Sequence, residues 1–369
     1  GLVSAEGYNN YLAFSMPKNE DFYALQNRND WVISQNHRMN VRWQYNNRLA
    51  NEYDWTYESF PGLHSNGLTR INKGAGINYL WTLSANHILD TSVSYSRFEE
   101  GSPRVVPLQF GPSDVGLSDY LEARAGDNRV LPRLDFNNLN DVIDSYPVIS
   151  GIGTTGEVRV TMTSIKGNHT LKYGMQHRLN WWTGRGPGFS SGRFTFRNNW
   201  TRRADNDNVS AQHAHEFAAF LMGLPNAIDI DTNDSVFLST PRTGLFIQDD
   251  FRLPDKLRLS LGLRWEREGG MSERFNRGIA GDFIGDLQQP FTAAAKAAYA
   301  LNPIAQLDPA NFNPVGGTAY LGTNGFDTYT KGSDVFLPKL GIVWSLNNKT
   351  VFRAGYDLSG QGFFTSSVI

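Results

Sequence analysis

One segment of the sequence matches a dinucleotide-binding pattern. Residues 151–156 read GIGTTG, and in dinucleotide-binding proteins such glycines form a tight turn before a helix whose first N–H groups bind the phosphates. The residues that follow here, 157–162, read EVRVTM and favour a strand. Because a phosphate site of this kind needs the start of a helix, we interpret the segment as a glycine-rich loop.

Two further groups of residues raise the question of metal or acid–base chemistry. His213, His215 and Glu216 lie close together, but histidines two positions apart do not share a helix face and no third ligand is evident, which favours a polar loop. Asp249 and Asp250 are adjacent, and adjacent residues of a strand point to opposite faces. This placement argues against a pair of catalytic carboxylates.

The other residue types give no indication of an enzyme. The chain has no Cys, and its seven His and its Ser residues form neither a nucleophile elbow nor an ordered triad. The sequence therefore predicts no catalytic residue, no cofactor and no metal site. A net charge of −2, without a cluster of Lys and Arg, also excludes a nucleic-acid partner.

The composition differs from that of an average soluble domain. Charged residues are few, at 19%, whereas aromatic residues reach 13% and there are 36 Gly. No run approaches the roughly 18 apolar residues that a membrane helix requires, and the mean hydropathy is −0.41. A membrane β-barrel keeps such a low value, because its strands show lipid only every second side chain. The chain begins at Gly1 without a signal peptide, which we interpret as a processed or internal piece.

Alternation of apolar and polar residues is the strongest structural pattern. It is clearest at 257–266, which read LRLSLGLRWE, and it recurs at 38–46, 75–83 and 171–181. A period of two predicts strands with one apolar and one polar face.

Turn signals separate pairs of these alternating runs. Asn residues, which tolerate the left-handed conformation of tight turns, stand at 36, 86, 168 and 347–348, and a Pro-Asp turn stands at 254–255. They predict five hairpins, with strands near 27–35 and 38–48, 70–84 and 87–98, 157–166 and 169–182, 241–253 and 256–268, and 336–346 and 350–358. Long irregular segments near 49–69, 99–156, 183–240 and 269–335 separate the hairpins.

This layout places every short turn at one end of the sheet and every long loop at the other. One such strand alone would fit a sandwich better, but sandwiches and propellers have mostly short connections. Outer-membrane barrels combine short periplasmic turns, long extracellular loops and aromatic girdles, and strands of this length cross a bilayer. The predicted fold class is therefore all-β, a transmembrane antiparallel β-barrel.

Several segments resemble the barrel domain of TonB-dependent receptors. The central one reads LFIQDDFR at 245–252 and continues with the strand at 257–266. The others are GNHTLKYG at 167–174, FAAFLMG at 217–223, FLPKLG at 336–341 and KTVFRAGY at 349–356. More narrowly, these segments resemble the OmpA-related, Oar-like subgroup, whose members carry a carboxypeptidase-regulatory-like domain before the plug. The first 150 residues fit mainly by pattern.

The resemblance implies that residues 1–369 form part of a larger barrel. It implies roughly 10–11 of about 22 strands, without the regulatory domain, plug, TonB box and C-terminal strands. The expected location is the bacterial outer membrane, with membrane lipid and TonB as partners and a scarce small molecule, peptide or glycan as the substrate taken up. Three alternatives stay open: a passive porin-like channel, a surface adhesion or assembly barrel, and a secreted all-β carbohydrate-binding protein or hydrolase.

The two faces of the predicted wall receive different roles. The lipid-facing candidates are Leu257, Leu259, Leu261, Leu263 and Trp265, and the lumen-facing candidates are Arg38, Arg42, Arg258, Arg264 and Glu266. Ligand recognition is expected in the segments 99–156, 183–240 and 269–335, since loops on a rigid scaffold carry specificity. Because about half of the strands of the family barrel are missing, these residues alone are expected to form an open sheet.

Overall fold

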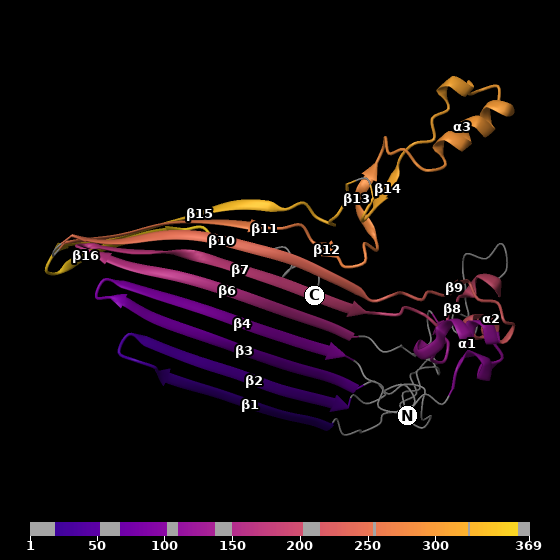
Figure 1. Cartoon of the computed structure of the whole chain (residues 1–369). Helices are drawn as coiled ribbons and strands as arrows, with labels where there is room; N and C mark the ends of the chain where they lie inside the picture. Colours follow the sequence, from indigo (N-terminus) through magenta and orange to yellow (C-terminus); the bar gives the residue numbers. More distant parts are fainter. Residues whose placement is uncertain are drawn as a thin grey trace.

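A computed structural model of the chain describes residues 19–51, 67–101, 110–136, 150–201, 215–253, 256–323 and 325–360. Its main feature is a large antiparallel sheet in which ten long strands follow one another in chain order (Figure 1). The strands are β1 (Asn19–Val32), β2 (His37–Asn51), β3 (Gly67–Ser84), β4 (His87–Gly101), β6 (Ser150–Lys166), β7 (His169–Arg185), β10 (Val236–Leu253), β11 (Leu257–Glu268), β15 (Ser333–Asn347) and β16 (Thr350–Asp357). A two-residue strand, β12 (Ser272–Glu273), pairs with β10.

Five hairpins with short turns build this sheet, as the turn signals predict. All five turns lie at one end of the sheet, and the long connections lie at the other (Figure 1). Gly167 has a φ of 56°, the left-handed conformation that the tight turn between β6 and β7 requires. Turns are also tied to the next hairpin: the N–H of Thr82 donates to the carbonyl of Asn36, and that of Ile165 to the carbonyl of Asn86, each at 2.8 Å. The turns thus help to fix the register between hairpins.

Eight of the ten long strands extend further toward the long connections than the sequence predicts, whereas β11 and β16 do not. β6 begins at Ser150, so the GIGTTG segment lies inside a strand, and the prediction of a glycine-rich loop there is wrong. The physical reason is the neighbouring strand β7, on which Trp182 covers this part of β6. A Cβ atom added to Gly151 would come within 2.7 Å of the Trp182 ring. Glycine is used here for close packing, which the apolar alternation does not reveal.

The long connections contain structure of their own, in contrast to the irregular segments expected. One small sheet joins β5 (Arg133–Phe136), β8 (Arg193–Phe196) and β9 (Ala227–Asp229), which come from two different connections. Beside it lie α1 (Asp119–Ala125), α2 (His215–Leu221) and the short 3-10 helices η1 (Pro112–Val115), η2 (Gly126–Asn128) and η3 (Asn198–Trp200). Phe136, Phe196 and Ala219 form a buried cluster against which Phe220 packs. This aromatic core holds the two connections together.

The connection between β11 and β15 forms an arm that projects away from the sheet (Figure 1). It contains the hairpin β13 (Ile279–Ile284) and β14 (Gly317–Tyr320), the helix α3 (Thr292–Leu301) and the 3-10 helix η4 (Pro309–Asn311). The ring of Tyr299 stacks on that of Phe312 with centroids 4.2 Å apart, which fixes α3 against the returning chain.

The ends of the sheet agree with the expected open arrangement. In the described part of the chain, β1 pairs only with β2 and β16 pairs only with β15. None of the described helices is both long and apolar enough to cross a membrane.

Candidate functional site

The strand register divides the predicted site residues between two faces of the sheet. Directly paired residues of adjacent strands share a face. The pairing runs from Arg264 through Phe246, Gly174, Thr161, Asp90 and Leu80 to Arg38, so Arg264 in β11 and Arg38 in β2 lie on the same face of the sheet. We call it the polar face. All five lumen-facing candidates lie on it, namely Arg38, Arg42, Arg258, Arg264 and Glu266, and the five lipid-facing candidates Leu257, Leu259, Leu261, Leu263 and Trp265 lie on the opposite, apolar face.

The exposure of the two faces is the reverse of that in a soluble half-buried sheet. On the apolar face, Leu261 and Leu263 are 49% and 47% exposed, as is much of the row around them. On the polar face, Glu266 is only 7% exposed. A soluble protein would bury the leucines and leave the carboxylate in water. A large exposed apolar surface of this kind marks contact with a membrane or another protein.

Aromatic side chains border the apolar face at two levels. Three strands each carry two aromatic residues eight positions apart on this face: Tyr23 and Trp31 in β1, Tyr173 and Trp181 in β7, and Phe336 and Trp344 in β15. Eight residues of strand span about 27 Å, and about 20 Å once a strand tilt near 40° is included. This height is close to the apolar band of about 25 Å in membrane barrels, which aromatic girdles flank.

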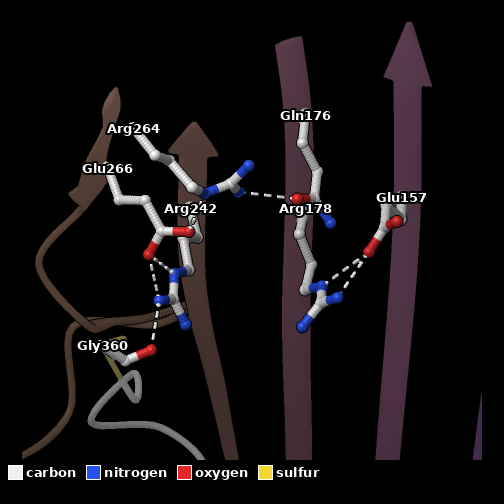
Figure 2. Close-up of polar contacts among 7 residues, drawn as sticks. All are labelled: Glu157, Gln176, Arg178, Arg242, Arg264, Glu266 and Gly360. Carbon is white, nitrogen blue, oxygen red and sulfur yellow. Dashed lines mark hydrogen bonds and ion pairs between the residues drawn. The ribbon is translucent and has the colours of Figure 1, made fainter. Parts of the chain in front are cut away.

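The polar face carries a charged network across β6, β7, β10 and β11 (Figure 2). Glu266 lies between two arginines: its Oε1 accepts from Nε of Arg264 at 2.6 Å and its Oε2 from Nε of Arg242 at 3.1 Å. The Nη2 atom of Arg264 also donates to Oε1 of Gln176 at 2.7 Å. Burial of Glu266 is therefore accompanied by full pairing of its carboxylate, which burial of a charge requires.

A second ion pair continues the network toward β6. Nε and Nη2 of Arg178 donate to the same oxygen of Glu157 at 2.8 and 2.6 Å (Figure 2). Between this pair and Glu266 lies a hollow of about 110 Å³, and Gly244 forms part of its wall. A Cβ atom on Gly244 would come within 2.5 Å of Nη2 of Arg264. The absence of a side chain at Gly244 therefore leaves room for the Arg264 guanidinium. The arrangement holds charged groups in fixed positions and contains no nucleophile.

The sequence predicts only part of this network. The alternation predicts Arg264 and Glu266 on this face, and the structure adds Glu157, Gln176, Arg178 and Arg242. The signal for two of them was present, because the apolar set Leu171, Tyr173, Met175, Leu179 and Trp181 leaves Gln176 and Arg178 on the other face by the same alternation. Which residues meet across strands follows only from the register.

The structure also places the residues considered for metal or acid–base chemistry. His213 lies outside the described residues, and Nδ1 of His215 lies 3.1 Å from Oγ1 of Thr201 at the start of α2. Asp249 and Asp250 point to opposite faces, as predicted: Asp249 lies 2.6 Å from Nδ1 of His169, and Asp250 accepts from the hydroxyl of Ser260 at 2.7 Å. Within the described ranges, no group of three His, Asp or Glu residues is arranged to hold a metal ion.

A buried carboxylate anchors the base of the projecting arm. Glu273 is 2% exposed and accepts backbone N–H groups of Phe275 at 2.8 Å, Arg277 at 2.9 Å and Phe237 at 3.2 Å. Burial alone would raise the pKa of Glu273, but these N–H groups and the Arg277 guanidinium together hold its pKa below the usual value. The ionised carboxylate therefore links the start of the arm to β10.

A sheet with an exposed apolar band, aromatic borders and a charged opposite face defines the class of outer-membrane barrel proteins. The chain belongs to the outer membrane beta barrel domain family, whose model matches residues 2–368. This membership confirms the predicted fold class and the bacterial outer-membrane location, and it points to a membrane protein without enzymatic activity.

Solved structures similar to the chain include two metal transporters and an import receptor. The copper transporter OprC is 11% identical over 93% of this chain and 37% of its own, with a TM-score of 0.48. The ferric-catecholate import receptor Fiu from E. coli K12, in its open form, is 11% identical over 94% of this chain and 48% of its own, with a TM-score of 0.47. The FrpB iron transporter from Neisseria meningitidis is 12% identical over 92% and 37%, with a TM-score of 0.45. The chain thus spans less than half of each of these structures, and no curated protein matches it.

Proposed function

We propose that the chain is part of the barrel wall of a TonB-dependent receptor, which takes up a scarce substrate across the outer membrane. The proposal is supported by the family membership and by the sequence segments around 245–266 that resemble this class. The same segments favour the Oar-like subgroup, in which a carboxypeptidase-regulatory-like domain precedes the plug. In such a receptor, TonB acts on parts of the protein outside these 369 residues.

The observation that carries the proposal is the inverted exposure of the two faces. The apolar face, with Leu257, Leu259, Leu261, Leu263 and Trp265, contacts lipid between the two aromatic borders. The polar face, with Arg38, Arg42, Arg258, Arg264 and Glu266, lines the interior. There the network around Glu266 keeps the wall rigid, because each charged group is held by strands on either side.

The long connections serve ligand recognition at the cell exterior. They gather at one end of the sheet and contain the aromatic core of Phe136 and Phe196 and the projecting arm, and therefore have a defined shape (Figure 1). The five short turns face the periplasm. Binding residues are presented by connections that the strands hold in place, as is usual for loops on a rigid scaffold.

Uptake is tested by comparing cells that produce the full-length protein with cells that lack it, each with and without TonB. The depletion of solutes from a defined medium is measured by mass spectrometry. We expect at least one solute to be depleted only when both the full-length protein and TonB are present. Depletion that persists without TonB would favour a passive porin-like channel, and unchanged solutes in all four strains would favour adhesion or assembly at the cell surface.

A further inference from the structure

Three arginines lie together on the polar face near the short turns. Arg252 in β10 is the direct cross-strand partner of Arg258 in β11, and Arg353 in β16 lies beyond Val343 in the same row. All three are exposed. Like charges directly opposite each other destabilise a sheet, and within the described residues none of the three forms an ion pair or a side-chain hydrogen bond. Placing Arg252 directly opposite Arg258 therefore destabilises the folded sheet, and a bound anion would offset this destabilisation.

The strands also leave a hollow beside these arginines. It has a volume of about 300 Å³ and is lined by Arg258 and Arg353, with Ser260, Gly341 and Gly355 between them. Gly341 and Gly355 are direct partners, so no side chain fills the space that they share. Among the residues that the structure describes, the acid next to this row on the same face is Asp250, and the Ser260 hydroxyl already donates to it. The hollow is therefore bordered by two guanidinium groups, and Val343, Ile342 and small residues line the space between them.

The net charge of the whole polar face also favours the binding of an anion. Across the ten long strands, this face carries fourteen Arg and Lys against nine Asp and Glu, an excess of five positive charges. The chain as a whole has a net charge of −2. Positive charge is thus concentrated on the face that lines the interior. A passage lined mainly by charges of one sign raises the local concentration of ions of the opposite sign.

We propose that Arg252, Arg258 and Arg353 bind a dissolved anion with carboxylate or phosphate groups, and that the transported substrate belongs to this chemical class. The inference rests on the proposed transport function and adds the substrate class to it. Guanidinium groups bind both kinds of oxyanion with paired N–H donors. A hollow of about 300 Å³ lies at the small end of ligand sites, which fits a small solute better than a protein segment.

The test is chemical modification of arginine in the full-length protein, purified in detergent. Phenylglyoxal is added with or without citrate or inorganic phosphate, and the modification of each arginine is followed by mass spectrometry. Arg267 is the internal control, because it lies on the apolar face with 59% of its side chain exposed. At an anion concentration about ten times its Kd, we expect roughly tenfold slower modification of Arg252, Arg258 and Arg353 and no change at Arg267.

Each result of this experiment decides the question. Protection by citrate alone assigns carboxylates, protection by phosphate alone assigns phosphates, and protection by both assigns the shared oxyanion chemistry. Equal rates with and without the anions overturn the proposal. Low reactivity of the three arginines before any anion is added also overturns it, because another segment of the protein then covers them. Neither negative result affects TonB-dependent uptake, which the solute-depletion experiment measures separately.

Discussion

Glu266 keeps two arginines apart on the polar face. Its carboxylate lies between Arg242 and Arg264, and its side chain is 9% exposed, while those of the arginines are 22% and 29% exposed. Replacing it with Gln leaves two partly buried guanidinium groups facing a neutral amide. Breaking a buried ion pair in this way costs several kcal/mol, and we expect about 2–4 kcal/mol here because the arginines retain some contact with solvent. Unfolding of the full-length Glu266→Gln variant by urea in lipid vesicles measures this cost.

The matched control for this variant is Asp30→Asn. Asp30 is also an acid on the polar face, but its partner Arg28 and its own side chain are 65% and 60% exposed. Exposed ion pairs contribute about 0–1 kcal/mol, so this change should hardly alter the free energy of unfolding. Equal effects of the two variants would contradict the structural role assigned to burial of Glu266.

Glu273 should make the base of the projecting arm sensitive to acid. Because its pKa is lowered in the folded protein, ionisation of Glu273 stabilises this region fully above the ordinary value of 4.5 and progressively less as the pH falls below it. We therefore expect hydrogen exchange of the amides of Phe275 and Arg277 to accelerate as the pH falls below about 4.5, beyond the intrinsic effect of pH. In the Glu273→Gln variant, fast exchange of these two amides should already be present at neutral pH. If the amides of Phe275 and Arg277 exchange slowly in that variant, Glu273 does not anchor the base of the arm.

At the residue scale, the sequence predicts the side of the sheet but not the partners. Arg264 and Glu266 follow from the alternation in 257–266, because every second side chain shares a face. Their contacts with Arg242 and Gln176 depend on a register between strands far apart in the sequence, which alternation does not specify. For the same reason, the row of Arg252, Arg258 and Arg353 emerges only from the structure.

At the scale of the strands, the apolar face can be tested with a matched pair of substitutions. Leu261 lies on the apolar face in the middle of β11, four residues from Leu257 and four from Trp265. If this face contacts lipid, Leu261→Arg places a charge near the middle of the membrane and should cost about 2–4 kcal/mol. Leu337→Arg is the control, because Leu337 is the direct partner of Arg264 on the polar face. The arginine introduced there faces Arg264, which adds a cost of at most about 1 kcal/mol, so we still expect a smaller loss from it than from Leu261→Arg, measured by folding into vesicles. Equal losses would contradict the assignment of the faces.

The strands themselves are largely predictable, and the connections are not. All five hairpins and their turns follow from alternation and from Asn-rich turn signals, because both are local in sequence. Most of the strands end further from the turns than predicted; in β6, glycines pack under Trp182 and interrupt the apolar pattern. The pairing of β5 with β8 joins two different connections and leaves no local signal.

For the whole molecule, the separation of short turns from long connections implies a fixed orientation in the membrane. In outer-membrane barrels, short turns face the periplasm and long loops face the exterior. The structure keeps these two sets of segments at opposite ends of strands of up to 18 residues (Figure 1). The three arginines of the polar face then lie at the periplasmic end of the strands.

This orientation can be read from single cysteines, because residues 1–369 contain none of their own. Gln35, in the turn between β1 and β2, and Ala297, in α3, are both exposed and are replaced one at a time in the full-length protein. A maleimide coupled to a polyethylene glycol too large to cross the outer membrane is added to intact cells. We expect it to label Ala297→Cys at once and Gln35→Cys only after the outer membrane is permeabilised, with the parent protein as the background control. Labelling of Gln35→Cys alone on intact cells would invert the orientation and place the arginine row at the outer end of the barrel.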